Sequence, residues 1–256
     1  QVAFVQILAS NPGNTVIGIV RNIADTEARI AEWRTPNVHL LQADMTKWDS
    51  LQKAAEATAA ITSGSLDYLI ANAALISDWS AFDPLSVLGQ DPQQLADDMS
   101  AHFATNVIGN THLVNSFMPL MLKGSVKKVL ILTTGMADND LVVKYGVHEG
   151  GPYTISKAAL NMVTSKFQAE YQKDGVLFVG ISPGVVETGL YNDMSEETLQ
   201  KFMIMGSKFA TYAPNFKAAA SPVDSAKAVL EVLEKSSLAN GDGGAFLSHL
   251  GNKQWL

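Results

Sequence analysis

Short apolar runs alternate with longer amphipathic or alanine-rich segments along nearly the whole chain of 256 residues. We expect the apolar runs to be buried parallel strands and the segments between them to be helices. This alternation predicts an α/β fold of three layers, a doubly wound, Rossmann-like parallel sheet with helices on both faces. The expected strands cover residues 15–20, 38–41, 66–70, 126–132, 176–181 and 244–247. The expected helices cover residues 1–10, 25–33, 47–62, 92–122, 152–173 and 223–235.

Composition and charge exclude several classes of protein. A net charge of −7 and the absence of a basic run argue against nucleic acid or an anionic membrane as a partner. No apolar stretch reaches about 18 residues, so we expect no transmembrane helix. The chain has no cysteine, which excludes disulfides, thiolate zinc sites and cysteine nucleophiles and fits a cytoplasmic protein. Because no linker or repeat interrupts the chain, we expect residues 1–256 to form one domain.

Polar residues follow the first three expected strands, where parallel α/β sheets bind their ligands. Arg21 follows the strand 15–20 directly, Asp44 follows the strand 38–41 closely, and Asn72 comes soon after the third strand. Asp44 would be able to accept a hydrogen bond from an adenine amine, or to cap the next helix. Asn72 would be able to fix neighbouring strand ends. The sequence therefore indicates a dinucleotide site at this edge.

The residue after the first expected strand bears on the choice of cofactor. Sites that prefer NAD(H) usually carry an acidic residue near this strand end, which binds the ribose diol. Here the segment is Val20-Arg21-Asn22, without a carboxylate. The planar guanidinium of Arg21 suits a 2′-phosphate. This favours NADP(H) over NAD(H), with a solvated surface arginine as the alternative.

Tyr153 and Lys157 are spaced four residues apart in an expected helix, so they share one face. A nearby ammonium favours the phenolate and lowers the pKa of a tyrosine. Such a pair provides a proton donor and acceptor near neutral pH. The same spacing also arises by chance, so the pair alone is weak evidence for a catalytic site. The polar residues at the expected strand ends support that interpretation.

Together these motifs resemble those of the short-chain dehydrogenase/reductase family, single-domain type, over essentially the whole chain. The turn Asn72-Ala73-Ala74 is similar to the family's Asn-Ala-Gly turn, with Ala74 in place of glycine. The segments 134–138 and 251–256 are similar to those of fungal members. The resemblance implies a catalytic set of Tyr153, Lys157, Thr134 and Asn106. It implies a cofactor site composed of Arg21, Asp44, Met45, Asn72, Ala73, Tyr153, Lys157, Pro183, Gly184, Val186 and Thr188.

The resemblance also implies a mechanism and an assembly. Thr134 would hold the substrate carbonyl, and Tyr153 would protonate it as hydride arrives from the nicotinamide. Lys157 would lower the tyrosine pKa and hold the ribose, and Asn106 would keep a water for proton resupply. The alternative for Asn106 is a buried polar group that caps a kinked helix. The family likeness implies an NADP(H)-dependent carbonyl reductase or alcohol dehydrogenase, assembled as a homodimer or homotetramer.

Two departures from the family pattern stand out. Thr134 occupies the position of the usual catalytic serine, and Gly135 follows it. If the register slips by one residue, Thr133 or Thr134 must serve from a neighbouring position. The family's first strand and its glycine-rich turn are expected before Gln1. That strand normally lies between the strands 15–20 and 66–70, so its absence would divide the sheet.

Residues 189–220 form a Met-rich and aromatic insertion. In the family this place is a substrate lid, which points to a bulky, apolar small-molecule substrate. An amphipathic helix that packs on the body is the alternative. The apolar members of the insertion are Tyr191, Met194, Phe202, Met203, Met205, Phe209, Tyr212 and Phe216.

Three other functions remain open. The run from Gly180 to Gly184 satisfies the hydrolase pattern Gly-x-Ser-x-Gly around Ser182, and Asp224 and His249 follow in hydrolase order. That pattern requires a helix directly after the serine, and residues 184–189 are poor helix formers. A cyclase or isomerase would keep the fold and use Tyr153 as an acid. A catalytically silent protein would only bind the cofactor or a partner.

Overall fold

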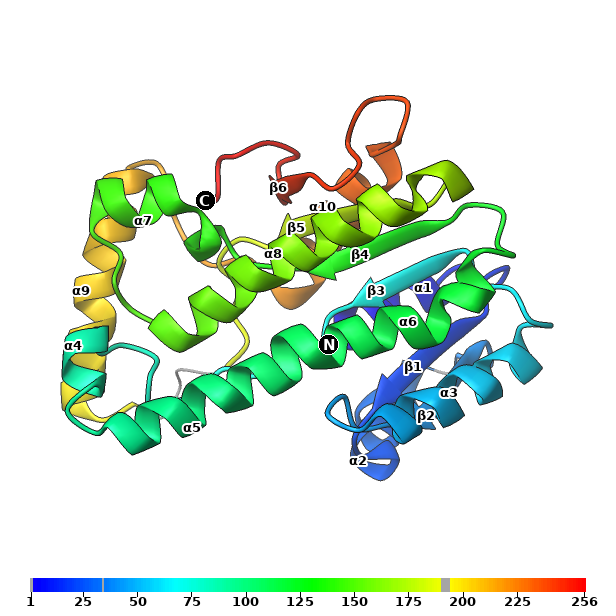
Figure 1. Ribbon diagram of the computed structural model, residues 1–256, viewed down its shortest axis with the longest axis horizontal. Helices are drawn as coiled ribbons and strands as arrows, with labels where there is room; N and C mark the ends of the chain where they lie inside the picture. The colour runs from blue at the N-terminus through cyan, green and yellow to red at the C-terminus, as the bar shows by residue number, and fades with distance from the viewer. Residues whose placement is uncertain (1, 34, 190–193) are drawn as a thin grey trace.

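The computed structural model describes residues 2–33, 35–189 and 194–256 (Figure 1). Its strands pair in parallel within each sheet, and helices connect them, which confirms the α/β fold predicted from the alternation. The strands are β1 (Val16–Val20), β2 (Val38–Gln42), β3 (Tyr68–Ala71), β4 (Lys128–Leu132), β5 (Leu177–Ser182) and β6 (Phe246–Ser248). The principal helices are α1 (Val2–Ala9), α2 (Ile23–Ile30), α3 (Trp48–Ile61), α4 (Leu85–Leu88), α5 (Pro92–His102), α6 (Asn110–Met121), α7 (Asn139–Tyr145), α8 (Gly151–Tyr171), α9 (Glu196–Tyr212) and α10 (Pro222–Lys235).

Two apolar cores lie on opposite faces of the strands, as the alternating side chains of β4 show. Val129 and Ile131 belong to a core shared with α3, α6 and α8. Leu130 and Leu132 belong to a second core shared with α10, against which Phe4 of α1 also packs. Because successive side chains of a strand point to opposite faces, an unbroken apolar run fills both cores. This arrangement gives the expected three layers.

The described strands form two hydrogen-bonded sheets rather than one. β1 pairs with β2 in a two-stranded sheet, and β3, β4, β5 and β6 follow one another in a four-stranded sheet. The division falls between β1 and β3, where the family resemblance implies a further strand. Figure 1 shows the arrowheads of β1, β3 and β4 on the same side of the molecule, so their carboxyl ends face one edge.

The long helix predicted over residues 92–122 is continuous but changes its winding. Between α5 and α6, residues Phe103–Gly109 form a π-helical segment. The side-chain amide of Asn110 donates to the backbone carbonyls of Thr105 (3.3 Å) and Asn106 (2.9 Å), which accommodates the wider turn. Segments of this kind occur frequently at functional sites. Here the segment contains the predicted catalytic Asn106.

Two further regions contain helices. The segment between β4 and α8 had no predicted element, and for the insertion 189–220 an amphipathic helix was the alternative to a lid. Between β4 and α8, α7 begins after Asp138, which accepts hydrogen bonds from two backbone amides, and Gly146 caps its end. In the insertion 189–220, α9 begins after Ser195, whose hydroxyl accepts from the amide of Thr198 (3.2 Å). Both caps are ordinary helix-start signals in the sequence. Within the described ranges, none of the helices combines the length and apolar character that a bilayer crossing requires.

Candidate active site

The structure brings Tyr153 and Lys157 together on the first turns of α8. The ammonium of Lys157 lies 5.9 Å from the centre of the Tyr153 ring. It also donates a hydrogen bond of 2.7 Å to the backbone carbonyl of Leu132, the last residue of β4. The end of the strand therefore fixes the position of the lysine next to the tyrosine.

Burial changes the proton affinity of Lys157. Its side chain lies within the core and is 2% exposed. Burial disfavours the charged form and lowers the pKa of the ammonium to about 8. The proton of Lys157 is therefore exchangeable near neutral pH, which suits a group that takes part in proton transfer.

Asn106 joins three parts of the site. Its side-chain oxygen accepts from the amide of Leu75 (2.7 Å), and its nitrogen donates to the carbonyl of Leu75 (3.0 Å). The same nitrogen donates to the hydroxyl of Ser156 (2.9 Å), which in turn donates to the carbonyl of Tyr153 (2.6 Å). Asn106 therefore clamps the loop after β3 to the start of α8. Asn106 is buried, but its side chain bonds to Leu75 and Ser156 and does not cap a helix end. The predicted hold on a water stays a prediction.

The two threonines at the end of β4 have different surroundings. The hydroxyl of Thr134 accepts from the amide of Met136 (3.3 Å) and so begins a short 3₁₀ turn, Gly135–Ala137. Thr133 is 3% exposed, and its hydroxyl oxygen has no hydrogen-bond partner among the described residues. The role predicted for Thr134 stays a prediction.

Arg21 and Asp44 lie at the carboxyl ends of β1 and β2. One oxygen of Asp44 accepts from the amide (2.9 Å) and the hydroxyl (2.7 Å) of Thr46, so the residue shapes a turn. These hydrogen bonds, the backbone one foremost, hold the pKa of the Asp44 carboxyl below its usual value. Arg21 is exposed, and no described carboxylate lies within ion-pair distance of its guanidinium. The nearby Asp25 instead accepts a hydrogen bond of 2.6 Å from Asn22 at the start of α2.

The segments after β2 and β3 pack against the start of α6. A Cβ on Gly109 would lie 2.8 Å from the carbonyl oxygen of Met45, so only glycine allows this approach. The side-chain amide of Asn110 donates to the carbonyl of Ala73 (3.4 Å). Asn72 is half-buried in this turn. The predicted cofactor residues Met45, Asn72 and Ala73 thus lie in the segments after β2 and β3, which both pack near the start of α6.

The segment Pro183 to Thr188 leaves the end of β5 without forming a helix. Gly184 adopts φ +76°, a backbone conformation that favours glycine. A Cβ there would also lie 2.7 Å from the ring of His249, so the available space requires glycine as well. Val186 forms a parallel bridge with Ala220, which pins the segment to the insertion. Thr188 is exposed at its end.

A cavity of about 590 Å³ lies next to this segment, but none of the predicted catalytic residues lines it. It lies between the residues that follow α9 and the last residues of the chain. The residues that line it include Pro183, Val185, Tyr212, Phe216, His249 and Gln254. Of the predicted cofactor residues, only Pro183 contributes to this cavity.

Helix α9 of the insertion is attached to the body by aromatic and ionic contacts. Phe202 packs edge-on against Phe82, and Tyr212 packs edge-on against Tyr145 of α7. Lys208 forms an ion pair with Glu149, whose side chain is 2% exposed. Tyr191 of the predicted lid and the glycine-rich turn expected before Gln1 lie outside the described residues.

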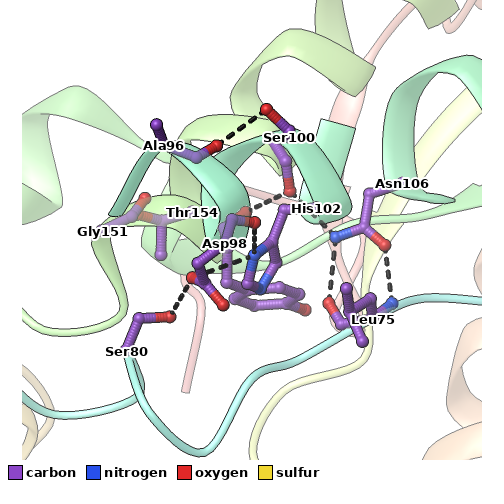
Figure 2. A network of polar contacts seen from close by, with 11 residues as sticks. Leu75, Ser80, Ala96, Asp98, Ser100, His102, Asn106, Gly151 and Thr154 are labelled. Atoms are coloured by element: carbon purple, nitrogen blue, oxygen red, sulfur yellow. Dashed lines mark hydrogen bonds and ion pairs between the residues drawn. The ribbon is translucent and has the colours of Figure 1, made fainter. Parts of the chain in front are cut away.

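The sequence did not reveal the role of His102, whose ring contacts Asp98 (Figure 2) and packs against Tyr153. His102 is fully buried, with its ring centre 6.5 Å from that of Tyr153. Its Nδ1 lies 2.8 Å from the backbone carbonyl of Asp98, and the hydroxyl of Ser80 donates to the Asp98 carboxylate (2.7 Å). The signal was present in the sequence, because Asp98, His102 and Asn106 recur every four residues.

The structure contradicts the hydrolase alternative. Ser182 is the last residue of β5, is 3% exposed, and accepts a hydrogen bond of 2.9 Å from the amide of Gly135. No helix follows it, so the turn that would expose a nucleophile is missing from these described residues. Asp224 accepts from the hydroxyl of Ser221 (2.7 Å) at the start of α10.

Comparisons with known proteins agree with the fold. The family model described as short chain dehydrogenase matches residues 2–199. The chain therefore belongs to the short-chain dehydrogenase family and is an oxidoreductase of that family. It is 49% identical to the short chain dehydrogenase virK of Hypocrea virens, over 99% of this chain and 94% of the relative. It is 40% identical to the short-chain dehydrogenase/reductase iacC of Pestalotiopsis fici, over the same shares.

Solved structures share the fold at low sequence identity. The NADPH-bound carbonyl reductase from chicken fatty liver is 22% identical, with a TM-score of 0.76 over 98% of this chain and 92% of that one. The gluconate 5-dehydrogenase from Burkholderia cenocepacia, in complex with NADP and tartrate, is 18% identical, with a TM-score of 0.70 over 98% and 89%. These likenesses support the Rossmann-like architecture.

Proposed function

We propose that the protein is an NADP(H)-dependent reductase that interconverts a carbonyl and an alcohol on a bulky, apolar small molecule. The observation that carries this proposal is the position of Lys157, buried next to Tyr153 and bound to the end of β4. An ammonium held there stabilises the phenolate that remains after the tyrosine gives up its proton. The pair is therefore equipped to protonate a carbonyl oxygen and to remove the proton in the reverse direction.

The chain's own residues suit a nicotinamide dinucleotide. The exposed guanidinium of Arg21 and the ionised carboxylate of Asp44 lie at adjacent strand ends, where they would hold the adenosine part. Close packing of Gly109 against Met45 and of Gly184 against His249 fixes the neighbouring turns, at which the cofactor would bind. When bound, the cofactor supplies or accepts the hydride, and Pro183, Val186 and Thr188 would hold its nicotinamide end.

The preference for NADP(H) rests on the charges at the end of β1. Arg21 has no described carboxylate partner, so its guanidinium is open to an anion. Asp25, the nearest carboxylate along the chain, is engaged by Asn22 and begins α2. Two fold neighbours contain this cofactor, the chicken reductase as NADPH and the gluconate dehydrogenase as NADP, which supports the same choice here.

The apolar character of the substrate rests on the insertion. Phe202 and Tyr212 of α9 pack toward aromatic side chains of the body, while Met203 remains 65% exposed. Such flexible apolar side chains adapt to large substrates. We propose that α9 covers the substrate during turnover.

An NADPH fluorescence titration of the full-length protein tests the proposal, followed by turnover of a panel of aliphatic and aromatic ketones. We expect saturable NADPH binding, weaker NADH binding, and NADPH consumption that is fastest with the larger ketones. A protein that binds neither nucleotide, or that consumes no NADPH with any ketone, would contradict the proposed function.

A further inference from the structure

The side chain of Trp255 packs directly against the backbone at the end of β4. A Cβ on Gly135 would lie 2.5 Å from Cβ and 2.6 Å from Cγ of Trp255, so the tryptophan occupies the space that a side chain would need. Gly135 follows Thr134, the residue expected to hold the substrate carbonyl. Trp255 is 3% exposed, and its ring stacks on Phe246 of β6 with the ring centres 4.3 Å apart. The contact with Gly135 is therefore part of the packed interior.

Gly135 is also held by the neighbouring strand β5. Its backbone amide donates a hydrogen bond of 2.9 Å to the hydroxyl of Ser182, the last residue of β5. Thr133 and Gly135 are buried, whereas Thr134 between them is half-buried. A shift of Gly135 would move Thr134 with it, because the two residues are joined by a peptide bond. The contacts of Gly135 with Trp255 and Ser182 therefore fix the place of the Thr134 hydroxyl.

The segment after β6 folds back so that Trp255 reaches this strand end. The side-chain oxygen of Asn252 accepts from the amide of Gln254 (2.7 Å) and from the hydroxyl of Ser248 (3.2 Å). The backbone carbonyl of Asn252 accepts from the amide of Ser248 (2.7 Å). Figure 1 shows this segment, in red, leaving β6 and running toward α7. A hydrogen-bonded turn therefore sets the position of Trp255.

Trp255 is attached to α9 of the insertion as well. Its backbone amide donates a hydrogen bond of 2.9 Å to the phenolic oxygen of Tyr212, the last residue of α9. The ring of Tyr212 packs edge-on against that of Tyr145, the last residue of α7, with 5.1 Å between the ring centres. A displacement of the end of α9 would move the backbone of Trp255, and with it the contact at Gly135.

We propose that Trp255 is a positioning residue, which keeps the Thr134 hydroxyl where it binds the substrate carbonyl, and that Tyr212 ties this position to α9. This inference rests on the proposed function, because it takes Thr134 as the group that binds the carbonyl. A catalytic group acts within a narrow range of positions, and a displacement of about 1 Å is able to slow a reaction about 10²-fold. The carbonyl-binding hydroxyl is therefore in place only while α9 is docked on the body.

A double-mutant cycle in kcat tests whether Trp255 acts through Thr134. Thr134→Val keeps the shape of the side chain but removes its hydroxyl, so kcat for ketone reduction should fall about 10²-fold. Trp255→Ala should lower kcat about tenfold when Thr134 is present, with NADPH affinity unchanged. In the Thr134→Val background it should have no further effect, because the group that it positions is already absent. Additive losses, or a wild-type kcat in Thr134→Val, would overturn the inference.

Two further replacements separate positioning from a general loss of structure. Trp255→Phe keeps an aromatic ring against Phe246 and should retain most of the wild-type kcat. Trp48→Phe, which replaces a tryptophan that is 41% exposed on α3, should leave kcat unchanged. A loss of kcat in Trp255→Phe as large as that in Trp255→Ala would contradict the assigned role.

The same cycle with Tyr212→Phe does not depend on the folding of Trp255→Ala. This replacement deletes the single oxygen atom that accepts from the amide of Trp255. We expect kcat to fall about threefold to tenfold when Thr134 is present, and to stay constant in the Thr134→Val background. Tyr145→Phe, which removes a hydroxyl from the neighbouring ring, should leave kcat unchanged. An equal loss in both backgrounds would contradict the link from Tyr212 to Thr134.

Methyl NMR of threonine-labelled protein gives a readout that does not depend on turnover. The Thr134 methyl resonance, assigned with Thr134→Val, reports through its order parameter how rigidly this side chain is held. We expect the order parameter to fall in Tyr212→Phe and to stay unchanged in Tyr145→Phe. That result in a protein that reduces no ketone would support the inference and contradict the proposed function. Ketone reduction by a protein whose Thr134 methyl is equally rigid in both variants would do the reverse.

Discussion

The ammonium of Lys157 lies 5.9 Å from the centre of the Tyr153 ring, and no carboxylate in the described part of the chain lies within ion-pair distance of it. The ammonium donates a hydrogen bond to the neutral backbone carbonyl of Leu132. The positive charge is therefore not cancelled by a fixed anion. It is available to a phenolate on Tyr153, and this relationship underlies the account of catalysis.

The buried ammonium of Lys157 should make stability depend on pH. Its pKa falls from 10.5 to about 8 in the folded protein, so the unfolded chain binds more protons between these values. The free energy of unfolding should thus rise with pH across this window, by an amount on the order of 3 kcal/mol. Urea unfolding of wild type and Lys157→Met from about pH 7 to pH 10.5 measures this rise. Lys166→Met, which replaces an exposed lysine, is the control. The prediction is contradicted if the free energy of unfolding rises equally with pH in the wild type and in Lys157→Met.

Arg21 should set the preference between the two nicotinamide cofactors. Arg21→Ala removes the guanidinium that is expected to pair with the 2′-phosphate, so NADPH affinity should fall by about tenfold to a hundredfold. NADH, which lacks that phosphate, should be nearly unaffected. Fluorescence titrations with both nucleotides measure the two effects. Arg29→Ala, on the exposed face of α2, should change neither affinity; a loss of NADH affinity as large as that of NADPH would refute the role of Arg21.

Asn106 should contribute to stability through the loop after β3. Asn106→Leu leaves the amide and carbonyl of Leu75 without their partner, which should lower the free energy of unfolding by about 1–3 kcal/mol. Chemical denaturation measures the loss. Gln93→Leu removes an amide whose hydrogen bond to Asp97 is exposed, so it should change stability by no more than about 0.5 kcal/mol. A similar loss of unfolding free energy in both variants would show that the hydrogen bonds between Asn106 and Leu75 do not stabilise the fold.

The ion pair between Lys208 and Glu149 should hold α9 against the body. Lys208→Met leaves a carboxylate that is 2% exposed without its counter-charge, which should cost about 3 kcal/mol of stability. The matched variant Lys201→Met breaks contacts to Asp83 and Glu197, which are 26% and 78% exposed. It should cost at most about 1 kcal/mol. Thermal or urea unfolding distinguishes the two, and a smaller loss for Lys208→Met than for Lys201→Met would contradict this account.

Much of the fold could be predicted from the sequence because burial dictates the residue pattern of the strands. β4 is apolar from Val129 to Leu132, and β5 has no polar side chain from Leu177 to Ile181. Both strands occupy the centre of the larger sheet, with both faces covered. The π-helical turn of Phe103–Gly109 could not be predicted in this way. It depends on the amide of Asn110, whose partners lie in the preceding turn and in the loop after β3.

The candidate site was predicted in part. The spacing of Tyr153 and Lys157 was informative because both lie on one helix, whose geometry is known in advance. The hydrogen bond from Lys157 to Leu132 joins residues far apart in the sequence, so no local pattern reveals it. The spacing of His102 from Asn106 was visible in the sequence, but its contact with Tyr153 was not. Its burial and its position beside Tyr153 follow from the packing of α5 against α8, which the sequence does not display.

The replacement Tyr153→Phe tests the central claim most directly, because it removes only the phenolic oxygen. We expect the kcat of NADPH-dependent ketone reduction to fall about 10²–10⁴-fold, while NADPH binds to the variant as tightly as to the wild-type protein. Tyr171→Phe, at the other end of α8, should leave kcat unchanged. A Tyr153→Phe variant that reduces ketones at the wild-type rate would contradict the assignment of Tyr153 as the proton donor, and with it the proposed mechanism.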